Sequence, residues 1–168
     1  MANKLYQYLA KDHERLDKLL EKAIGEDFQV DYETYEEFRK GLLRHISIEE
    51  KIVFPFMYEH DVKKTDPFIE QLRLDHSAIV LLLVAEPSPS TIATLLSVLE
   101  IHNELEERVE GLYEMLEEMA GEDSSPLYEQ FLASPDVPVL PTKPRSKVMG
   151  FLQRALERAG HPFIEKDE

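Results

Sequence analysis

The sequence predicts an all-α protein: an up-down-up-down four-helix bundle followed by a C-terminal helical tail. Three observations support this fold class. Apolar residues recur at helical spacing in four long segments. The connections between these segments are short, which favours antiparallel neighbours in a bundle. No segment alternates polar and apolar residues, so we expect no sheet.

The first two predicted helices cover residues 3–24 and about 31–60. Gly25 provides a stop for the first helix, and Pro55 should kink or interrupt the second. A histidine lies in each apolar stripe. The stripe of the first helix contains Leu5, Leu9, His13, Leu16, Leu20 and Ile24, and that of the second contains Tyr35, Phe38, Leu42, His45, Glu49, Ile52 and Phe56.

The third predicted helix begins at Asp66-Pro67, an N-cap aspartate followed by proline at the first helical position. Pro87-Ser88-Pro89-Ser90 ends it and caps the fourth helix, which runs over residues 91–120. Histidines again lie within both stripes. These contain Ile69, Leu72, His76, Ile79 and Leu83 in the third helix, and Leu95, Leu99, His102, Glu106, Val109, Tyr113 and Leu116 in the fourth.

We assign residues 1–122 to the bundle and residues 123–168 to a C-terminal extension. The extension begins with a short helix, and four prolines then favour extended backbone. An amphipathic helix follows over residues 146–159, with Phe151 on its apolar side. Because this helix is locally basic, we expect it to pack on the acidic bundle. A protein partner or a second copy of the chain is the alternative.

Composition excludes several classes of function. The net charge of −15 argues against nucleic acid as a partner, because phosphate binding needs a basic surface. The absence of cysteine excludes disulfides, iron–sulfur clusters and thiolate zinc sites. No apolar run is long enough for a membrane span, and the first residues lack an apolar signal core. We therefore expect a cytoplasmic protein with no membrane partner.

Two of the predicted helices contain nearly the same string of residues. The strings are His45-Ile-Ser-Ile-Glu49-Glu50-Lys51-Ile52 and His102-Asn-Glu-Leu-Glu106-Glu107-Arg108-Val109. Each places an imidazole and a carboxylate one turn apart on a core-facing stripe. Asp12-His13 and Asp75-His76 occupy matching positions in the preceding helices. Each half of the chain thus supplies two histidines and one glutamate, which predicts a pseudo-symmetric site.

The four histidines should lie at one level of the bundle. In antiparallel neighbours, residues equally far from the connecting loop lie at the same height. Counted from the loops, the histidines agree to within about one helical turn. Glu49 and Glu106 lie about 6 Å beyond their histidines on the same faces.

A single histidine on an apolar stripe is commonly a hydrogen-bonded core residue, but this layer also contains two glutamates. An ionised carboxylate in an apolar interior costs several kcal/mol unless it is paired, and no lysine or arginine lies on these stripes. We therefore expect a two-metal site, with a network of histidinium and glutamate as the alternative. The predicted ligands are His13, His45, Glu49, His76, His102 and Glu106.

Counting bonds defines the predicted site further. If both glutamates bridge, the six side chains provide four bonds to each metal ion. A bridging oxide or hydroxide would make five, which leaves one open position on each six-coordinate ion. Imidazole and carboxylate suit iron, manganese and zinc, so the ligand types alone do not select the metal.

The order of one histidine, H-x-x-x-E, one histidine and H-x-x-x-E over about residues 3–120 resembles the hemerythrin-like family, which has the HHE cation-binding domain. Glu49-Glu50 followed by Phe54-Pro55 is also similar to the second helix of that family. The resemblance implies a four-helix bundle with an oxo- or hydroxo-bridged, non-haem di-iron centre. It implies that His13 and His45 bind one iron, His76 and His102 bind the other, and Glu49 and Glu106 bridge them.

The chain departs from the oxygen-carrying hemerythrins on the third helix, where those proteins have a second histidine. The candidate positions here are Leu72 and Val80. Both metals would then keep an open position, which argues against reversible oxygen carriage. The ligand set is closer to that of di-iron proteins that repair iron–sulfur clusters, but this chain lacks their cysteine-bearing segment.

These observations lead to three functional hypotheses. The first is a non-catalytic di-iron protein that binds or senses O2 or NO, or that handles iron. The second is a di-iron oxidoreductase, a peroxidase or a nitric oxide reductase similar to the repair proteins, since a diatomic could be reduced between two open positions. The third is a regulatory module whose C-terminal helix reports the metal state to a partner.

Residues outside the predicted ligand set receive separate predictions. His60 and His161 lie off the histidine layer and are expected on the surface. Tyr113 is expected to pack in the core, with a place beside the ligands as the alternative. Asp12 and Asp75 either hydrogen-bond a ligating histidine or are exposed.

Overall fold

The computed structural model describes residues 3–168, and all regular elements in this range are helical. This confirms the all-α prediction, although residues 1 and 2 of the predicted bundle lie outside the described residues. The main helices are α1 (Lys4–Ala23), α2 (Tyr32–Ile48), α3 (Phe54–Val84), α4 (Pro89–Glu107), α5 (Leu112–Ala120), α6 (Ser124–Ala133) and α7 (Arg145–Ala159). Short elements are η1 (Glu26–Phe28), η2 (Glu49–Val53) and η3 (Gly121–Asp123).

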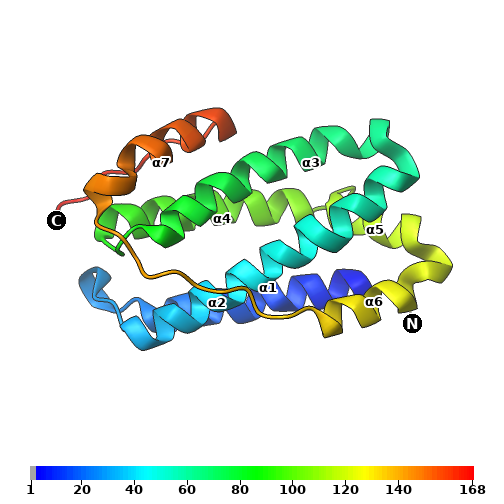
Figure 1. Ribbon diagram of the computed structural model, residues 1–168, viewed down its shortest axis with the longest axis horizontal. Helices are drawn as coiled ribbons and strands as arrows, with labels where there is room; N and C mark the ends of the chain where they lie inside the picture. The colour runs from blue at the N-terminus through cyan, green and yellow to red at the C-terminus, as the bar shows by residue number, and fades with distance from the viewer. Residues whose placement is uncertain (1–2) are drawn as a thin grey trace.

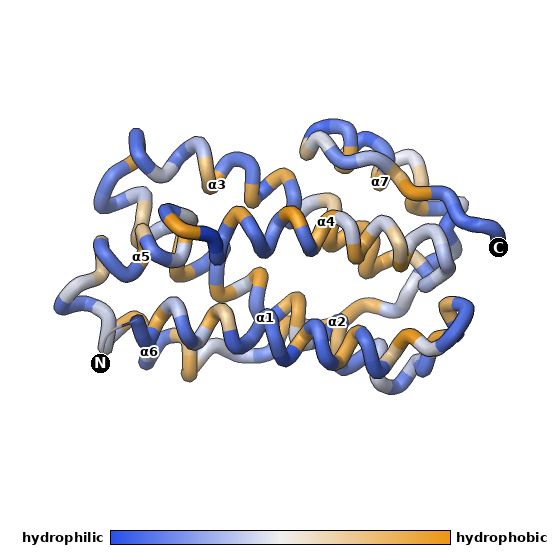
Figure 2. The backbone as a smooth tube through the Cα atoms, turned by 180° about the vertical axis from the view of Figure 1, so that it is seen from behind, coloured by the Kyte–Doolittle hydropathy of each residue, from blue (hydrophilic) through white to orange (hydrophobic). Residues whose placement is uncertain are grey.

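The helices α1 to α4 surround a common interior, with α1 packed on α2 and α3 packed on α4 (Figure 1). Hydrophobic residues alternate with hydrophilic ones along the helices (Figure 2). They form two buried clusters on either side of the histidine layer. One cluster includes Leu16, Leu20, Leu42, Ile79 and Leu99, and the other includes Leu5, Leu9, Ile48, Leu72 and Leu112.

The predicted second helix is divided near the histidine layer. It leaves α-helical geometry after Ile48 and forms one widened π-helical turn, η2, before α3 begins at Phe54. Pro55 has no N–H and cannot continue the normal hydrogen-bond pattern, and the widened turn lies directly before it. This turn carries Glu49, so the irregularity coincides with a predicted ligand.

The predicted start of the third helix at Asp66 is wrong. The chain bends instead at Asp61, whose backbone is non-helical (φ −160°, ψ 91°). The Asp61 carboxylate accepts a hydrogen bond from the backbone N–H of Lys64 at 3.1 Å, and its carbonyl accepts one from the Thr65 hydroxyl at 2.7 Å. Asp61 therefore caps the second part of α3, and Pro67 lies inside the helix.

The predicted fourth helix is also interrupted. It ends at Glu107 and resumes at Leu112 as α5. Val109, which the stripe placed in the core, is 80% exposed. A Cβ atom at Gly111 would lie 2.7–2.9 Å from three backbone carbonyl oxygens. The close backbone approach at this break therefore requires glycine.

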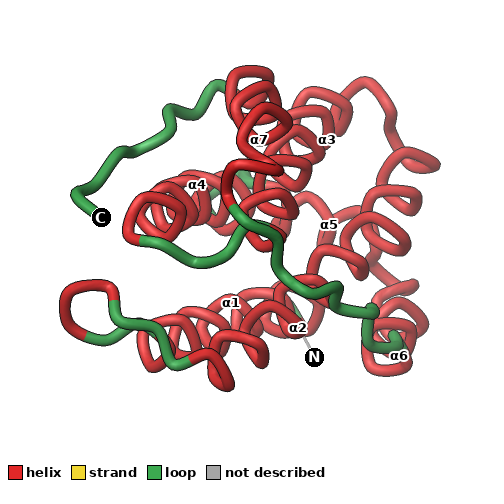
Figure 3. Tube along the Cα trace, turned by 60° about the vertical axis from the view of Figure 1, so that its left-hand side comes forward, coloured by secondary structure: helices red, strands yellow, loops and turns green. Residues whose placement is uncertain are grey.

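The C-terminal extension lies against the bundle. The linker between α6 and α7 is extended (Figure 3), and the buried Arg39 side chain donates to the carbonyls of Leu140 at 2.7 Å and Leu83 at 2.9 Å. Helix α7 packs on α3, with Leu152 and Leu156 in the core. Phe151, predicted on the apolar side, is 60% exposed. No helix among residues 3–168 has the length and hydrophobicity needed to cross a membrane.

Candidate metal centre

The structure brings all six predicted ligands into one buried layer. The main helices α1, α2 and α3 contribute one histidine each, η2 contributes Glu49, and α4 contributes both a histidine and a glutamate. The relative exposure of these residues is at most 4%. Their potential ligand atoms form two groups, each with all atoms within 4.8 Å of one another. The groups are Glu49, His76, His102 and Glu106, and His13, His45 and Glu106.

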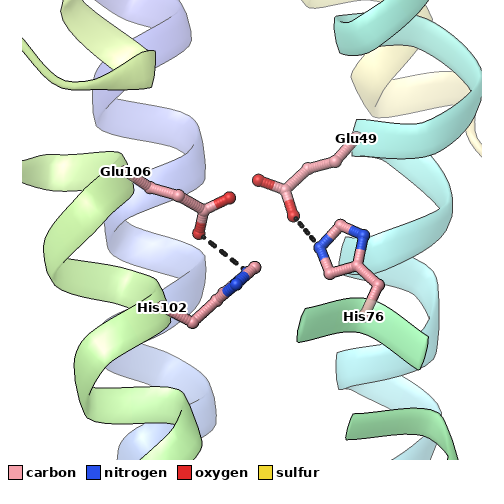
Figure 4. Close-up of side chains that lie close together, drawn as sticks. All are labelled: Glu49, His76, His102 and Glu106. Carbon is pink, nitrogen blue, oxygen red and sulfur yellow. Dashed lines mark ion pairs between the residues drawn. The ribbon is translucent and has the colours of Figure 1, made fainter. Parts of the chain in front are cut away.

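The two glutamates point toward each other from η2 and α4 (Figure 4). In one half of the site, Nε2 of His76 lies 3.3 Å from Oε1 of Glu49, and Nε2 of His102 lies 3.4 Å from Oε1 of Glu106. In the other half, Nε2 of His13 lies 3.3 Å from Oε1 of Glu106. Nε2 of His45 lies 3.6 Å from Oε1 of Glu49. All four Nε2 atoms therefore face the carboxylates.

A carboxylate also accepts from the other ring nitrogen of each histidine. Asp12 lies 2.9 Å from Nδ1 of His45, and Asp75 lies 3.0 Å from Nδ1 of His102. The sequence had left open whether these aspartates were hydrogen-bonded or exposed. Such contacts fix the ring orientation and keep the proton on Nδ1, so that Nε2 presents its lone pair.

Sequence reasoning did not assign partners to the other two histidines. Glu50 lies 2.8 Å from Nδ1 of His76, and Glu107 lies 2.9 Å from Nδ1 of His13. Both are the second glutamate of a Glu-Glu pair, so the doubled glutamates in the two repeated strings were the available signal. Each aspartate orients a histidine of its own half of the chain, and each second glutamate orients one of the opposite half.

Within the described residues, three buried side-chain atoms make no hydrogen bond: Oε1 of Glu49, Nε2 of His76 and Oε2 of Glu106. Buried polar atoms are nearly always satisfied, and a bound ion is one explanation for exceptions. All three belong to predicted ligands. The available donor atoms, imidazole nitrogen and carboxylate oxygen, therefore fit a metal ion.

Neighbouring carboxylates and burial shift the pKa values of the buried histidines. His13 and His76 are the two whose Nδ1 atoms contact a glutamate from the opposite half of the chain. Burial lowers the pKa of His13, but hydrogen bonds to Glu106 and Glu107 outweigh burial and raise the pKa to about 10. Burial likewise lowers the pKa of His76, and the neighbouring carboxylates of Glu49 and Glu50 outweigh burial and raise it to about 10. Burial dominates at His102 and lowers its pKa to about 4.

The two buried glutamates differ in their tendency to ionise. Burial alone would raise both pKa values. The surrounding imidazoles hold the pKa of Glu49 well below its ordinary value, whereas burial and the charge of Glu49 raise that of Glu106. The carboxylate of Glu49 therefore ionises more easily than that of Glu106.

Tyr113 is buried, as predicted, but its hydroxyl also reaches the predicted ligands. The phenol oxygen lies 2.9 Å from Oε2 of Glu49 and 3.2 Å from Oε1 of Glu106. It also lies 3.1 Å from Nε2 of His13 and 3.2 Å from Nε2 of His45. Tyr113 follows Glu106 by seven residues, about two helical turns, and helical side chains tilt toward the N-terminus. This spacing was the signal in the sequence that its hydroxyl could reach Glu106.

The prediction that His161 lies on the surface is wrong, whereas His60 is exposed as expected. Nε2 of His161 lies 2.7 Å from Oδ1 of Asp75. The amide of Gln71 donates to the same carboxylate oxygen at 2.9 Å and to the carbonyl of Ala159. His161 follows α7 in the chain, and it reaches Asp75 because α7 packs on α3.

The chain was also compared with known proteins. The sequence model of the family described as Hemerythrin HHE cation binding domain matches residues 4–128. Searches of curated proteins and of solved structures found no match. The matched region contains α1 to α5 and all six predicted ligands. The chain therefore belongs to the hemerythrin HHE cation-binding domain family, and it binds metal cations.

Proposed function

We propose that the protein holds two iron ions in this layer, inside an up-down-up-down bundle, and that the centre binds O2 or NO. His13 and His45 would hold one iron, and His76 and His102 the other. Glu49 and Glu106 would bridge them. The observation that carries the proposal is the orientation of the four imidazoles. Each has Nδ1 bound to a carboxylate and Nε2 directed at the carboxylates of the interior.

The position of Glu49 supports a bridging role. Its Oε1 lies 3.6 Å from Nε2 of His45 in one half and 3.3 Å from Nε2 of His76 in the other, and its Oε2 lies 2.9 Å from the phenol oxygen of Tyr113. A carboxylate that lies beside histidines of both halves can contact two ions at once. This arrangement supports a shared site over two separate single-metal sites.

The metal-free alternative is a network of histidinium and glutamate. Such a network would satisfy the inward-facing atoms with hydrogen bonds to one another. Nε2 of His76 and Oε1 of Glu49 are close, yet neither is satisfied. Charge also favours cations, because six carboxylates surround four imidazoles: those of Asp12, Glu49, Glu50, Asp75, Glu106 and Glu107.

When bound, iron would supply ligand binding and electron transfer. The residues of the chain orient the imidazoles, exclude water and limit the size of a ligand. Apolar clusters lie on both sides of the layer, and the predicted ligands are at most 4% exposed. A surface hollow of about 360 Å³ reaches His13 and Glu107, at the edge of the half that contains His13 and His45. This degree of burial favours a diatomic over a larger substrate.

The optical spectrum of the iron-loaded protein, recorded anaerobically and after addition of O2 or NO, tests this proposal. We expect a change in the iron absorption with each gas that binds, and no change in His45→Ala, whose loaded metal should be depleted. His60→Ala, which alters an exposed histidine, is the matched control. If the spectrum of the iron-loaded protein did not change with either gas, the proposed binding of O2 or NO would be contradicted.

The same centre could instead catalyse reduction of peroxide or nitric oxide, and turnover distinguishes these functions. A binding or sensing protein should take up about one equivalent of ligand and then stop. Sustained consumption that is abolished in Glu106→Ala would establish the oxidoreductase. The same measurement on His60→Ala controls for activity from loosely bound iron.

A further inference from the structure

We infer that the phenol oxygen of Tyr113 is a fifth protein ligand of the metal held by His13 and His45. The two metal positions would then be chemically different. This inference rests on the proposed two-metal centre and deepens it, because it identifies the position that keeps an open coordination site.

The distances around the phenol oxygen match those within one coordination sphere. Two neighbouring ligands of an octahedral ion, each about 2.1 Å from it, lie roughly 3.0 Å apart. The Tyr113 oxygen lies 2.9–3.2 Å from four donor atoms, two imidazole nitrogens and two carboxylate oxygens. Nε2 of His13 and Oε1 of Glu106 are themselves 3.3 Å apart. The ligand atoms of His13, His45 and Glu106 also lie within 4.8 Å of one another. One ion could therefore contact these three atoms and the phenol oxygen, with Glu49 as the proposed bridging ligand.

With a metal bound, the imidazoles would be neutral, and hydrogen bonding alone would not satisfy all of these atoms. The Nδ1 atoms of His13 and His45 donate to carboxylates, so both Nε2 atoms are acceptors. The phenol then has one proton for four neighbouring acceptors. A cation between these atoms removes the conflict, because all of them can donate electron pairs to it.

Among residues 3–168, the other proposed metal position has no equivalent of Tyr113. In the repeat of the two strings, Tyr113 follows Glu106 by the same interval as Phe56 follows Glu49. Phe56 has no donor atom, and its ring packs against His60 at 4.2 Å. Next to His76 is another apolar ring, that of Phe54, stacked at 5.7 Å. The pseudo-symmetry of the ligands is therefore broken at this one position.

Tyr113 is held in place by its surroundings. It has no exposed surface, and the ring of Tyr6 packs against its ring edge-on at 5.9 Å. The break between α4 and α5 lies at Gly111, two residues before Tyr113, and α5 begins directly after it at Leu112. The side chain is thus fixed by packing and by a backbone approach that requires glycine.

The bond count changes accordingly. The first metal would have two imidazoles, two carboxylate oxygens and the phenol oxygen, and a bridging hydroxide would complete six ligands. The second metal would have five, which leaves one open position beside His76 and His102. A diatomic would therefore bind to the second metal alone. Tyr113 would thus fill one of the two positions that the six other ligands leave open.

Ligation replaces the Tyr113 O–H bond by an O–metal bond, and the proton passes to solvent without transfer of electrons. A phenolate bound to ferric iron gives a strong visible charge-transfer band and characteristic resonance Raman modes of the ring. We expect both in the oxidised wild-type protein. In Tyr113→Phe, both should be lost while two irons remain bound. Tyr6→Phe, which alters the neighbouring ring, should retain both signals.

Titration with Zn²⁺ provides a second measurement that does not depend on iron. The ultraviolet difference spectrum should show one ionised tyrosine per chain in the wild type and in Tyr6→Phe, and none in Tyr113→Phe. If the wild type bound two metals without a phenolate signal, the proposed role of Tyr113 would be overturned, but the two-metal centre would not. Less than one bound metal per chain would overturn both this role and the proposed function.

Discussion

Nε2 of His161 and Oδ1 of Asp75 lie 2.7 Å apart, although 86 residues separate them in the chain. The other oxygen of Asp75 lies 3.0 Å from Nδ1 of His102. One buried carboxylate therefore joins the C-terminal extension to a predicted metal ligand. This contact connects the docking of α7 with the orientation of the site.

Replacing His161 with alanine should weaken both folding and metal binding. Loss of a buried hydrogen bond to a charged group costs about 1.5–3 kcal/mol. Groups that orient a ligating histidine typically change metal affinity by about 10–100-fold. Chemical denaturation of the metal-free protein and competition with a chelator measure the two effects. His60→Ala is the control, and equal behaviour of the two variants would refute the connection.

Replacing Gly111 with alanine should disrupt the break between α4 and α5. The new Cβ would lie 2.7–2.9 Å from three carbonyl oxygens. We expect a loss of roughly 1–3 kcal/mol in the free energy of unfolding, within the usual range for a steric change of this kind.

Gly150→Ala is the matched control for that variant. Gly150 is exposed in α7, and the nearest atom to an added Cβ is an arginine nitrogen at 3.7 Å. Alanine should stabilise this helix by about 0.5–1 kcal/mol. Opposite signs for the two glycines in thermal unfolding would support the steric requirement at the break, and a neutral Gly111→Ala would contradict it.

Replacing Arg39 with alanine should release the linker. The buried guanidinium bonds to the carbonyls of Leu83 and Leu140, and to the carboxylate of Glu36. An unsatisfied buried carbonyl costs about 1–3 kcal/mol, and limited proteolysis should cut residues 134–144 faster. Lys40→Ala, which removes only an exposed ion pair to Asp136, should leave the cleavage rate nearly unchanged. Equal cleavage of both variants would show that Arg39 does not secure the linker.

Replacing Glu50 with alanine should affect the metal proposed beside His76 more than the one proposed beside His13 and His45. Glu50 accepts from Nδ1 of His76 at 2.8 Å. Its loss frees the ring to rotate, and metal affinity should fall by about 10–100-fold at that position. Stepwise chelation should show one metal released early, whereas Glu59→Ala, at an exposed position, should release both as the wild type does.

The convergence of the proposed ligands was predictable because helical periodicity and residue order are local properties. His13, His45, His76 and His102 each occupy one stripe, and short connections bring those stripes to one level. The start of the third helix could not be predicted from such local properties. Asp61 and Asp66 can both serve as an N-cap, and Pro67 favoured Asp66, although the helix is capped by Asp61.

Contacts that depend on tertiary packing were harder to predict. His161 reaches Asp75 only through a linker and a helix whose docking site has no local signal. The hydroxyl of Tyr113 reaches the ligands beside a break that Gly111 alone indicated in the sequence. Glu50 and Glu107 were visible as doubled glutamates, but periodicity does not show which ring nitrogen a neighbouring carboxylate contacts.

Metal analysis of the anaerobically purified protein tests the central claim most directly. The proposed centre predicts two metal ions per chain in the wild type. His45→Ala should lose metal and stability together, because binding and folding are linked. A normally folded wild-type protein with less than one metal ion per chain, or unchanged metal content in His45→Ala, would contradict the two-metal centre.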